Sequence, residues 1–124
     1  MLGHRTLRSL AEGNVIKAVS QAGLVLAISG RERAASWSTI GSVVAGVAVN
    51  GNGEMFVLAL VVDDEDDASK LFTVAETERI WPELTTMLPV GLPAIAPFEH
   101  WGAALADKPG VVTLYQRPVP ALMS

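Results

Sequence analysis

Residues 55–89, MFVLALVVDDEDDASKLFTVAETERIWPELTTMLP, predict a strand, an acidic turn, a second strand and a short helix. The first part, 55–62, is an unbroken apolar run whose length alone does not separate a buried strand from a buried helix. Its flanks favour a strand, because two Asn-Gly pairs precede it and five acidic residues follow it, and both are turn chemistry. Residues 70–74 resume with strand-forming side chains. The two runs therefore predict a β-hairpin with an acidic tip.

A helix is predicted after this hairpin, because the spacing of apolar residues changes from two to three or four. The residues on its apolar face are Ile80, Trp81, Leu84, Met87 and Leu88. Pro82 is tolerated only among the first positions of a helix, whose N–H groups have no partner inside the helix. We therefore expect the helix to start within residues 79–82. It should end at Leu88, because the residue before a proline disfavours the helical conformation.

Four further strands are predicted upstream, at 15–19, 24–28, 34–37 and 43–49. Residues 29–33 are expected to form a polar hairpin loop between the second and third strands. The Asn50-Gly51 pair is a strong hairpin signal and joins the fourth strand to the run at 55–62. These connections are too short for crossovers, which predicts an antiparallel meander. Gly46 in the middle of a strand indicates a bulge, a bend or a close backbone neighbour.

The C-terminal part adds a connector, a helix and a strand. Prolines at 89, 93 and 97 predict an extended apolar connector after the first helix. Pro97 suits the first position of a second helix, whose apolar stripe is Phe98, Trp101 and Leu105. Residues 111–117 then alternate well enough for a last strand.

The predicted fold is therefore α+β: a bent antiparallel sheet of six to seven strands, a half-barrel, with one or two C-terminal helices packed across it. We expect a single domain at 14–117, an N-terminal leader at 1–13 and a C-terminal tail at 118–124.

The amino-acid composition excludes several classes of function. The chain has 124 residues, of which 50% are hydrophobic and 18% charged, and this excludes intrinsic disorder. The net charge of −4 and the scattered basic residues argue against a nucleic-acid partner. The absence of cysteine excludes disulfides and thiolate metal sites. The longest apolar run is far too short to span a bilayer, so we expect no membrane span and a cytoplasmic location. The apolar excess indicates an oligomer or a covered sheet face.

The acidic turn is the main candidate binding site, and its residues are Asp63, Asp64, Glu65, Asp66 and Asp67. Carboxylates are the ligands that calcium and magnesium prefer, but the glycine and glutamate of an EF-hand loop are missing from the required positions. The same charge would serve as a solvated hairpin tip that keeps sheet edges apart. It would also serve as a docking patch for a basic partner. We expect no metal to be bound.

No catalytic site is predicted. His4 lies in the leader, and His100 has no second histidine or cysteine nearby in sequence, so His100 is interpreted as a surface residue. No Gly-x-Ser-x-Gly elbow and no phosphate-binding glycine loop are present. We therefore expect no enzyme activity, no catalytic residue and no cofactor.

Other polar and aromatic residues have structural interpretations. The tryptophans at 37, 81 and 101 are expected in the core, with a ligand pocket as the alternative. Glu76, Glu78 and Glu83 precede or open a helix, where the helix dipole stabilises acids.

The spacing of a few aromatic residues also suggests a family. The segment Ser36-Trp37-Ser38-Thr39-Ile40 is followed by two strands, then by Glu76, Trp81, Leu84 and Leu88-Pro89, a tryptophan at 101, and a closing Tyr115-Gln116-Arg117. Over residues 14–117 this pattern resembles small uncharacterised bacterial domains with a pleckstrin-homology-like plan. The resemblance implies a bent sheet closed at one end by a helix. The chain departs from that plan because a connector, a second helix and a strand follow the first helix. The resemblance implies no activity.

Three functions remain open. The first is a non-enzymatic protein-interaction or scaffold module, with an unidentified protein partner or with itself as a homodimer. The second is a small-ligand carrier or sensor with a pocket between sheet and helix. The third is an immunity or inhibitor protein that presents its acidic loop to a basic target.

Overall fold

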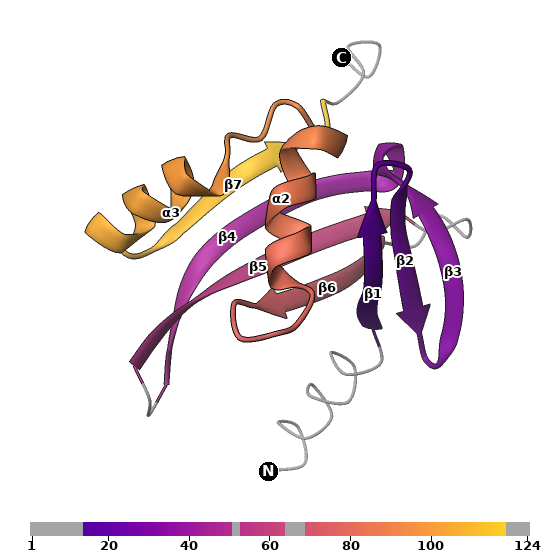
Figure 1. Cartoon of the computed structure of the whole chain (residues 1–124), viewed down its shortest axis with the longest axis horizontal. Coiled ribbons are helices and arrows are strands. Elements are labelled where there is room, and N and C mark those ends of the chain that lie inside the picture. The colour runs from indigo at the N-terminus through magenta and orange to yellow at the C-terminus, as the bar shows by residue number, and fades with distance from the viewer. Residues whose placement is uncertain (1–13, 51–52, 64–68, 119–124) are drawn as a thin grey trace.

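The computed structural model describes residues 14–50, 53–63 and 69–118, and these form an α+β fold of seven strands and two α-helices (Figure 1). The predicted fold class is confirmed. The predicted leader at 1–13 and residues 119–124 of the predicted tail lie outside the described residues. No helix in the described part of the chain is long and apolar enough to cross a membrane.

The first three strands form one antiparallel sheet in the order β1-β2-β3. Their bounds are β1 Asn14–Ser20, β2 Gly23–Ile28 and β3 Arg31–Ser36. The loop predicted at 29–33 is wrong, because only Ser29 and Gly30 form the turn and Arg31 already pairs with Ile28. Both turn residues have positive φ, 52° and 85°, and positive φ at both central residues is the geometry of a two-residue type I′ hairpin.

The other four strands form a second antiparallel sheet in the order β6-β5-β4-β7. Their bounds are β4 Ile40–Asn50, β5 Gly53–Asp63, β6 Ser69–Ala75 and β7 Val111–Gln116. Asn50 pairs with Gly53 at the end of the hairpin that joins β4 and β5, and residues 51–52 lie outside the described residues.

The seven strands thus divide between two sheets, where the sequence pattern predicted a single bent one. A 3-10 turn, η1 (Trp37–Thr39), separates the two sheets along the chain. It turns the buried Trp37 into the core, where the indole N–H donates to the backbone oxygens of Ser20 at 3.1 Å and Gln21 at 3.0 Å.

Two helices follow β6, α2 (Trp81–Gly91) and α3 (Phe98–Asp107). Helix α2 starts where Pro82 predicted, but its predicted end at Leu88 is wrong, because Pro89 lies inside the last turn. Leu88 and Leu92 are both buried, and the Leu92 N–H donates to the Leu88 oxygen at 2.7 Å. This burial on both sides of Pro89 holds the extra turn. The connector is therefore a short turn with a buried Ile95, where an extended segment was predicted.

The core lies between the two sheets and under both helices. Its largest fully buried side chains come from β2, β4, β5, β6 and α2: Leu24, Leu26, Ile40, Val43, Leu58, Leu60, Phe72, Val74, Leu84 and Leu88. The predicted core positions of the three tryptophans are confirmed, because each is at most 8% exposed.

The aromatic part of this core joins the two helices to the four-stranded sheet. Trp81 and Trp101 lie edge to face at 6.3 Å between ring centroids, and Phe98 stands 4.7 Å from Trp101. Phe56 of β5 completes the group at 5.6 Å from Phe98. Such edge-to-face pairs add to the free energy of burial and fix the position of α3 on the sheet.

Gly46 has the close backbone neighbour that its position predicted. A Cβ at Gly46 would lie 3.3 Å from the Gly110 oxygen and 3.5 Å from Cγ2 of Val111. The Gly110 oxygen also accepts a hydrogen bond from the N–H of the next residue, Val47, at 3.2 Å. The absence of a side chain at Gly46 thus lets the start of β7 approach β4.

Candidate functional site

The acidic segment begins at the end of β5, and Asp63 is the one member of it among the described residues. Its carboxylate forms an ion pair with Arg117, which follows β7, and accepts a hydrogen bond from the Ser69 hydroxyl at 3.2 Å. Asp64, Glu65, Asp66 and Asp67 lie outside the described residues.

Arg117 connects three parts of the chain at this point. Besides its ion pair with Asp63, its guanidinium donates to the Ser38 backbone oxygen at 2.6 Å, and its own N–H donates to the Gly41 oxygen at 2.8 Å. Asp63 therefore holds the end of β7 against η1 and β5, which is a structural role.

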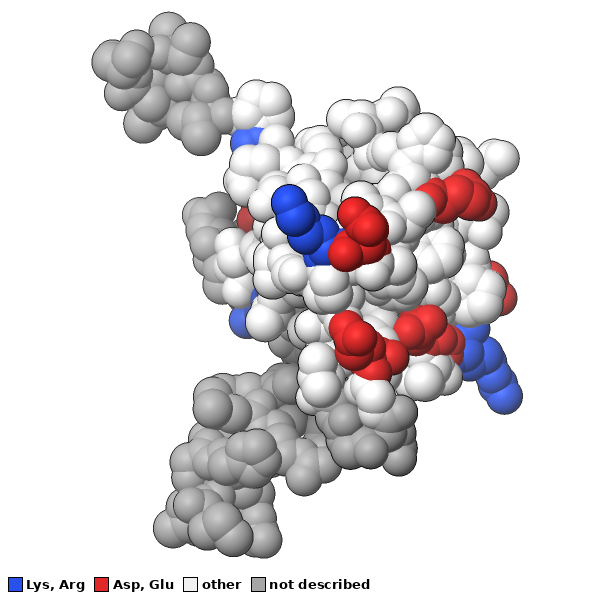
Figure 2. Space-filling view, turned by 90° about the vertical axis from the view of Figure 1, so that its left-hand side faces the viewer, with Lys and Arg blue, Asp and Glu red and all other residues white. Residues whose placement is uncertain are grey.

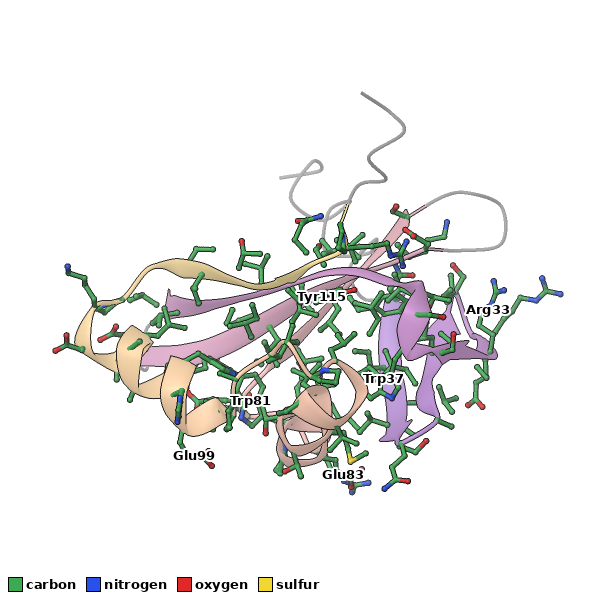
Figure 3. The ribbon with its side chains drawn as sticks, turned by 90° about the horizontal axis from the view of Figure 1, so that it is seen from above. Arg33, Trp37, Trp81, Glu83, Glu99 and Tyr115 are labelled. Carbon is green, nitrogen blue, oxygen red and sulfur yellow. The ribbon has the colours of Figure 1, made fainter. Side chains whose placement is uncertain are left out.

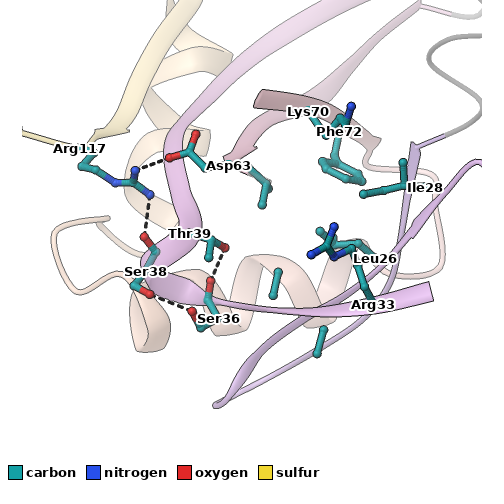
Figure 4. A pocket seen from close by; sticks show the side chains of 13 residues that line it. Leu26, Ile28, Arg33, Ser36, Ser38, Thr39, Asp63, Lys70, Phe72 and Arg117 are labelled. Carbon is teal, nitrogen blue, oxygen red and sulfur yellow. Dashed lines mark hydrogen bonds and ion pairs between the residues drawn. The ribbon is translucent and has the colours of Figure 1, made fainter. Parts of the chain in front are cut away.

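A cleft of about 400 Å³, here called the inter-sheet cleft, opens beside this ion pair between β2, β3 and η1 on one side and β5 and β6 on the other (Figure 4). Its floor is apolar and belongs to the core, with Leu26, Val62 and Phe72 each at most 3% exposed. Among the described residues, its polar lining is formed by Arg33, Ser36, Ser38, Thr39, Asp63, Lys70 and Arg117.

Two cationic side chains enter this cleft from opposite walls (Figure 4). Arg33 of β3 is paired with the buried Leu26, and Lys70 of β6 is paired with the buried Val62. Directly paired residues in neighbouring strands point to the same face, so both cations occupy inward positions of their sheets. Other inward positions in these strands hold apolar residues, such as Phe72 and Val74 in β6.

The hydroxyl groups on the cleft wall are held by short local hydrogen bonds. The Ser36 and Ser38 hydroxyl oxygens lie 2.8 Å apart, and the Thr39 hydroxyl donates to the Ser36 backbone oxygen at 2.6 Å. The described part of the lining contains three cationic side chains, Arg33, Lys70 and Arg117, and one carboxylate, Asp63. On another side of the molecule, acidic and basic side chains are spread singly over a mostly uncharged surface (Figure 2).

A second candidate surface is the face of the four-stranded sheet turned away from the helices. Both α2 and α3 lie on the other side of this sheet (Figures 1 and 3). Strand pairing places the following residues on this face, here called the outer face: Ser42, Val44, Gly46, Ala48, Met55, Val57, Ala59, Val61, Leu71, Thr73, Ala75, Val111, Thr113 and Gln116.

The outer face carries no charged side chain between its two ends. Its polar members are Ser42, Thr73, Thr113 and Gln116, and the rest are apolar or glycine. Leu71 is 53% exposed and Val111 is 77% exposed, on the two flanking strands. The residues of the central strands β4 and β5 are half-buried by one another. At one end of the outer face, the charged side chains of Asp63 and Arg117 form an ion pair.

The remaining polar candidates have structural partners or lie on the surface. Glu76 accepts the Phe56 N–H at 2.9 Å and Glu78 accepts the Ala75 N–H at 2.8 Å, so both hold backbone at the end of the hairpin rather than a helix dipole. Glu83 does lie in the first turn of α2, as predicted. His100 is exposed on α3, in agreement with its interpretation as a surface residue. Among the described residues, no group of three or more His, Cys, Asp or Glu side chains is placed to hold a metal ion.

Two features of these surfaces were missed in the sequence. The inter-sheet cleft was not predicted, since the expected pocket lay between sheet and helix. Arg33 was assigned to a loop, and Lys70 was taken only as the start of a strand. Comparisons with protein-family models, with curated proteins and with solved structures find no match to this chain.

Proposed function

We propose that this protein is a non-enzymatic interaction module that forms a homodimer through its outer face. The supporting observation is the absence of charge across that face over all four strands. An antiparallel sheet with one solvated face normally alternates apolar inward residues with polar outward residues. Here β4 and β5 are apolar on both faces, which is the pattern of a sheet that is covered on both sides.

The chemistry of the face suits a second copy of the same chain. Each monomer carries a net charge of −4, so two copies repel each other wherever their charged surfaces meet. The outer face is the large surface of the described fold where they would meet without this repulsion. Two sheets packed face to face lie about 10 Å apart with their strands roughly aligned, and a two-fold axis would place the same residues against each other.

The size of the face is adequate for a dimer. Its strands have 11, 11, 7 and 6 residues, and at ~3.4 Å per residue and ~4.8 Å between strands they cover roughly 550 Å². Two such faces bury roughly 1,100 Å² in total, just above the lower bound of about 1,000 Å² for a specific interface. We therefore expect a reversible dimer with a micromolar dissociation constant.

The test is sedimentation equilibrium on the full chain and two matched variants. Ala59 lies at the centre of the outer face, paired with Val44 on one side and Thr73 on the other. Ala59→Glu leaves a solvated charge in the monomer but buries an unpaired charge in the dimer, so we expect the dimer dissociation constant to rise by about 100-fold or more. Ala103→Glu, on the exposed surface of α3, makes the same change of charge and should leave the dimer unchanged.

Two results would overturn this proposal. The first is a wild-type chain that sediments as a monomer at all accessible concentrations. The second is a dimer that Ala59→Glu and Ala103→Glu weaken equally, because that result would reflect net charge and not the outer face. Circular dichroism of each variant establishes that the monomer fold is retained.

A further inference from the structure

We infer that the free edge of β7 is a second self-association site, which pairs with β7 of another copy in an antiparallel arrangement centred on Val112. Strand β7 ends the four-stranded sheet beside β4, so its other edge has no neighbouring strand in the described part of the fold (Figure 1). This edge is a different surface from the outer face. The pairing rests on the proposed dimer for its strength, because one short edge contact buries little surface.

Strand β7 is the one edge strand of the two described sheets that has no charged residue. Its sequence, VVTLYQ, also has no proline and is rich in strand formers. The other edge strands do carry charges, which are Lys17 in β1, Arg31, Glu32 and Arg33 in β3, and Lys70 in β6. Charges of this kind keep sheet edges from pairing with other chains. The edge of β7 lacks this protection.

The backbone of β7 offers hydrogen-bonding groups to its free edge. The Gly110 oxygen accepts the Val47 N–H from β4 at 3.2 Å, so Gly110 faces β4. Consecutive residues of an antiparallel strand alternate in facing the paired strand, so Val112 also faces β4. The N–H and C=O groups of Val111 and Thr113 therefore point to the free edge. Beyond Thr113 the register with β4 shifts, which limits the regular edge to these three residues.

A two-fold axis at Val112 uses all of these groups. It places Val111 of each copy opposite Thr113 of the other, and each such pair exchanges both of its main-chain hydrogen bonds. Neighbouring registers do not achieve this. An axis at Val111 would set Thr113 against Pro109, which has no N–H. An axis at Thr113 would set Val111 against Tyr115, which lies beyond the register shift.

The side chains around the axis suit this pairing. Val112 is 38% exposed and lines a hollow of about 520 Å³ together with the exposed Ala104 of α3. The Val112 side chain of a second copy would lie at this hollow. Val111 is 77% exposed and would meet Thr113 of the second copy on the outer face. Cross-strand pairs of β-branched side chains stabilise antiparallel sheets.

The buried area also favours assembly through both surfaces. A face-to-face dimer of single chains buries roughly 1,100 Å², which is near the lower bound for a specific interface. Two copies joined through β7 would present one continuous sheet with twice the outer face. Two such sheets packed face to face would bury roughly 2,200 Å², which is in the range of permanent assemblies.

The experiment is sedimentation equilibrium of the full chain up to millimolar concentration, with two variants that carry the same substitution. Val112→Lys sets two like charges opposite each other on the axis, so the dissociation constant of the step beyond the dimer should rise by about 10-fold or more. Val49→Lys, at a position 76% exposed in β4, should leave this step unchanged. Each lysine reduces the net negative charge, so a loss of association cannot result from repulsion between whole chains.

An uncharged variant tests the backbone contact itself. Thr113→Pro removes an N–H that faces the free edge and none that bonds β4, so the monomer should keep its fold while the edge pairing is lost. Amide hydrogen exchange gives a direct signature. At high concentration the N–H groups of Val111 and Thr113 should exchange more slowly in the wild type than the same groups do in Val112→Lys, in which Thr113 is retained.

The inference fails if the wild type shows no association beyond the dimer at millimolar concentration, or if Val112→Lys and Val49→Lys weaken that association equally. Ala59→Glu separates it from the proposed dimer. Dimers of Val112→Lys together with monomers of Ala59→Glu would support both surfaces. Dimers of Ala59→Glu that disappear when Val112→Lys is added would overturn the outer-face dimer and leave the β7 pairing intact.

Discussion

Gly91, in the last turn of α2, lies directly against the indole ring of Trp37. A Cβ at Gly91 would overlap Cγ, Cδ2 and Cε2 of that ring. Trp37 has no room to retreat, because it is 8% exposed and its indole N–H is held by two backbone oxygens of the β1–β2 turn. The contact therefore links η1, helix α2 and the three-stranded sheet at one point.

Gly91→Ala should lower the free energy of unfolding by about 1–3 kcal/mol, since the added methyl overpacks the site by more than the improved helix propensity recovers. Urea denaturation monitored by tryptophan fluorescence measures the change. Gly110→Ala is the matched control, because a Cβ at Gly110 has no atom within 4 Å. Equal stability of Gly91→Ala and wild type would mean that Trp37 adopts another rotamer at no cost.

Single residues show how far the candidate site was predictable. The glycine and asparagine residues at 50–53 predicted the β4–β5 hairpin, because the preference of these residues for turns does not depend on the rest of the fold. The inward positions of Arg33 and Lys70 were not predicted, because a cation is usually a surface residue. The inward face of a strand is also known only once the register of that strand is known. A signal was present in Lys70, which falls in phase with Phe72 and Val74 two and four residues later. Asp63 was predicted as part of a free acidic tip, but its partner Arg117 lies 54 residues away in the sequence.

At the scale of an element, α2 departs from what its sequence indicates by continuing through Pro89. A proline inside a helix removes one backbone hydrogen bond and crowds the carbonyl four residues earlier, here that of Thr85. The Thr85 hydroxyl donates to the backbone oxygens of Trp81 at 3.0 Å and Pro82 at 3.2 Å, one turn earlier. Burial of Leu88 and Leu92 outweighs the local preference to end the helix.

Pro89→Ala should therefore raise the free energy of unfolding by about 1–2 kcal/mol, because it restores a helical N–H and removes the clash, and this gain exceeds the loss of rigidity in the unfolded chain. Pro82→Ala is the control, since Pro82 lies in the first turn, where proline costs nothing. Differential scanning calorimetry of the two variants measures both effects. A lower melting temperature for Pro89→Ala would show that the packing of the proline ring stabilises this turn.

The individual strands were predictable from local sequence patterns. The way in which these strands group into sheets was not. Six strands before α2 and one after α3 follow from runs of strand formers between turn residues. The division into two sheets depends on η1, where three residues around Trp37 leave the strand conformation to bury one side chain. Pairing of β7 with the free side of β4 depends on contacts across two helices, and no local pattern encodes it.

At the scale of the whole molecule, a dimer through the outer face would couple association to folding. Because the dimer forms from folded chains, the melting temperature should rise with protein concentration, and Ala59→Glu should remove that dependence while Ala103→Glu keeps it. Thermal melts of the three proteins over a wide concentration range provide the measurement. A wild-type melting temperature that is independent of concentration would contradict the proposed dimer.

The strand order β6-β5-β4-β7 also bears on synthesis of the chain. Ser42 of β4 pairs with Gln116 of β7, so about 70 residues must leave the ribosome before one side of β4 finds its partner. At ~5–20 residues per second this interval lasts roughly 4–14 s. During that time the nascent chain presents one unpaired edge of an apolar strand of 11 residues to its neighbours on the same messenger. The closing strand thus arrives last at the position where mispairing between nascent chains is most favoured.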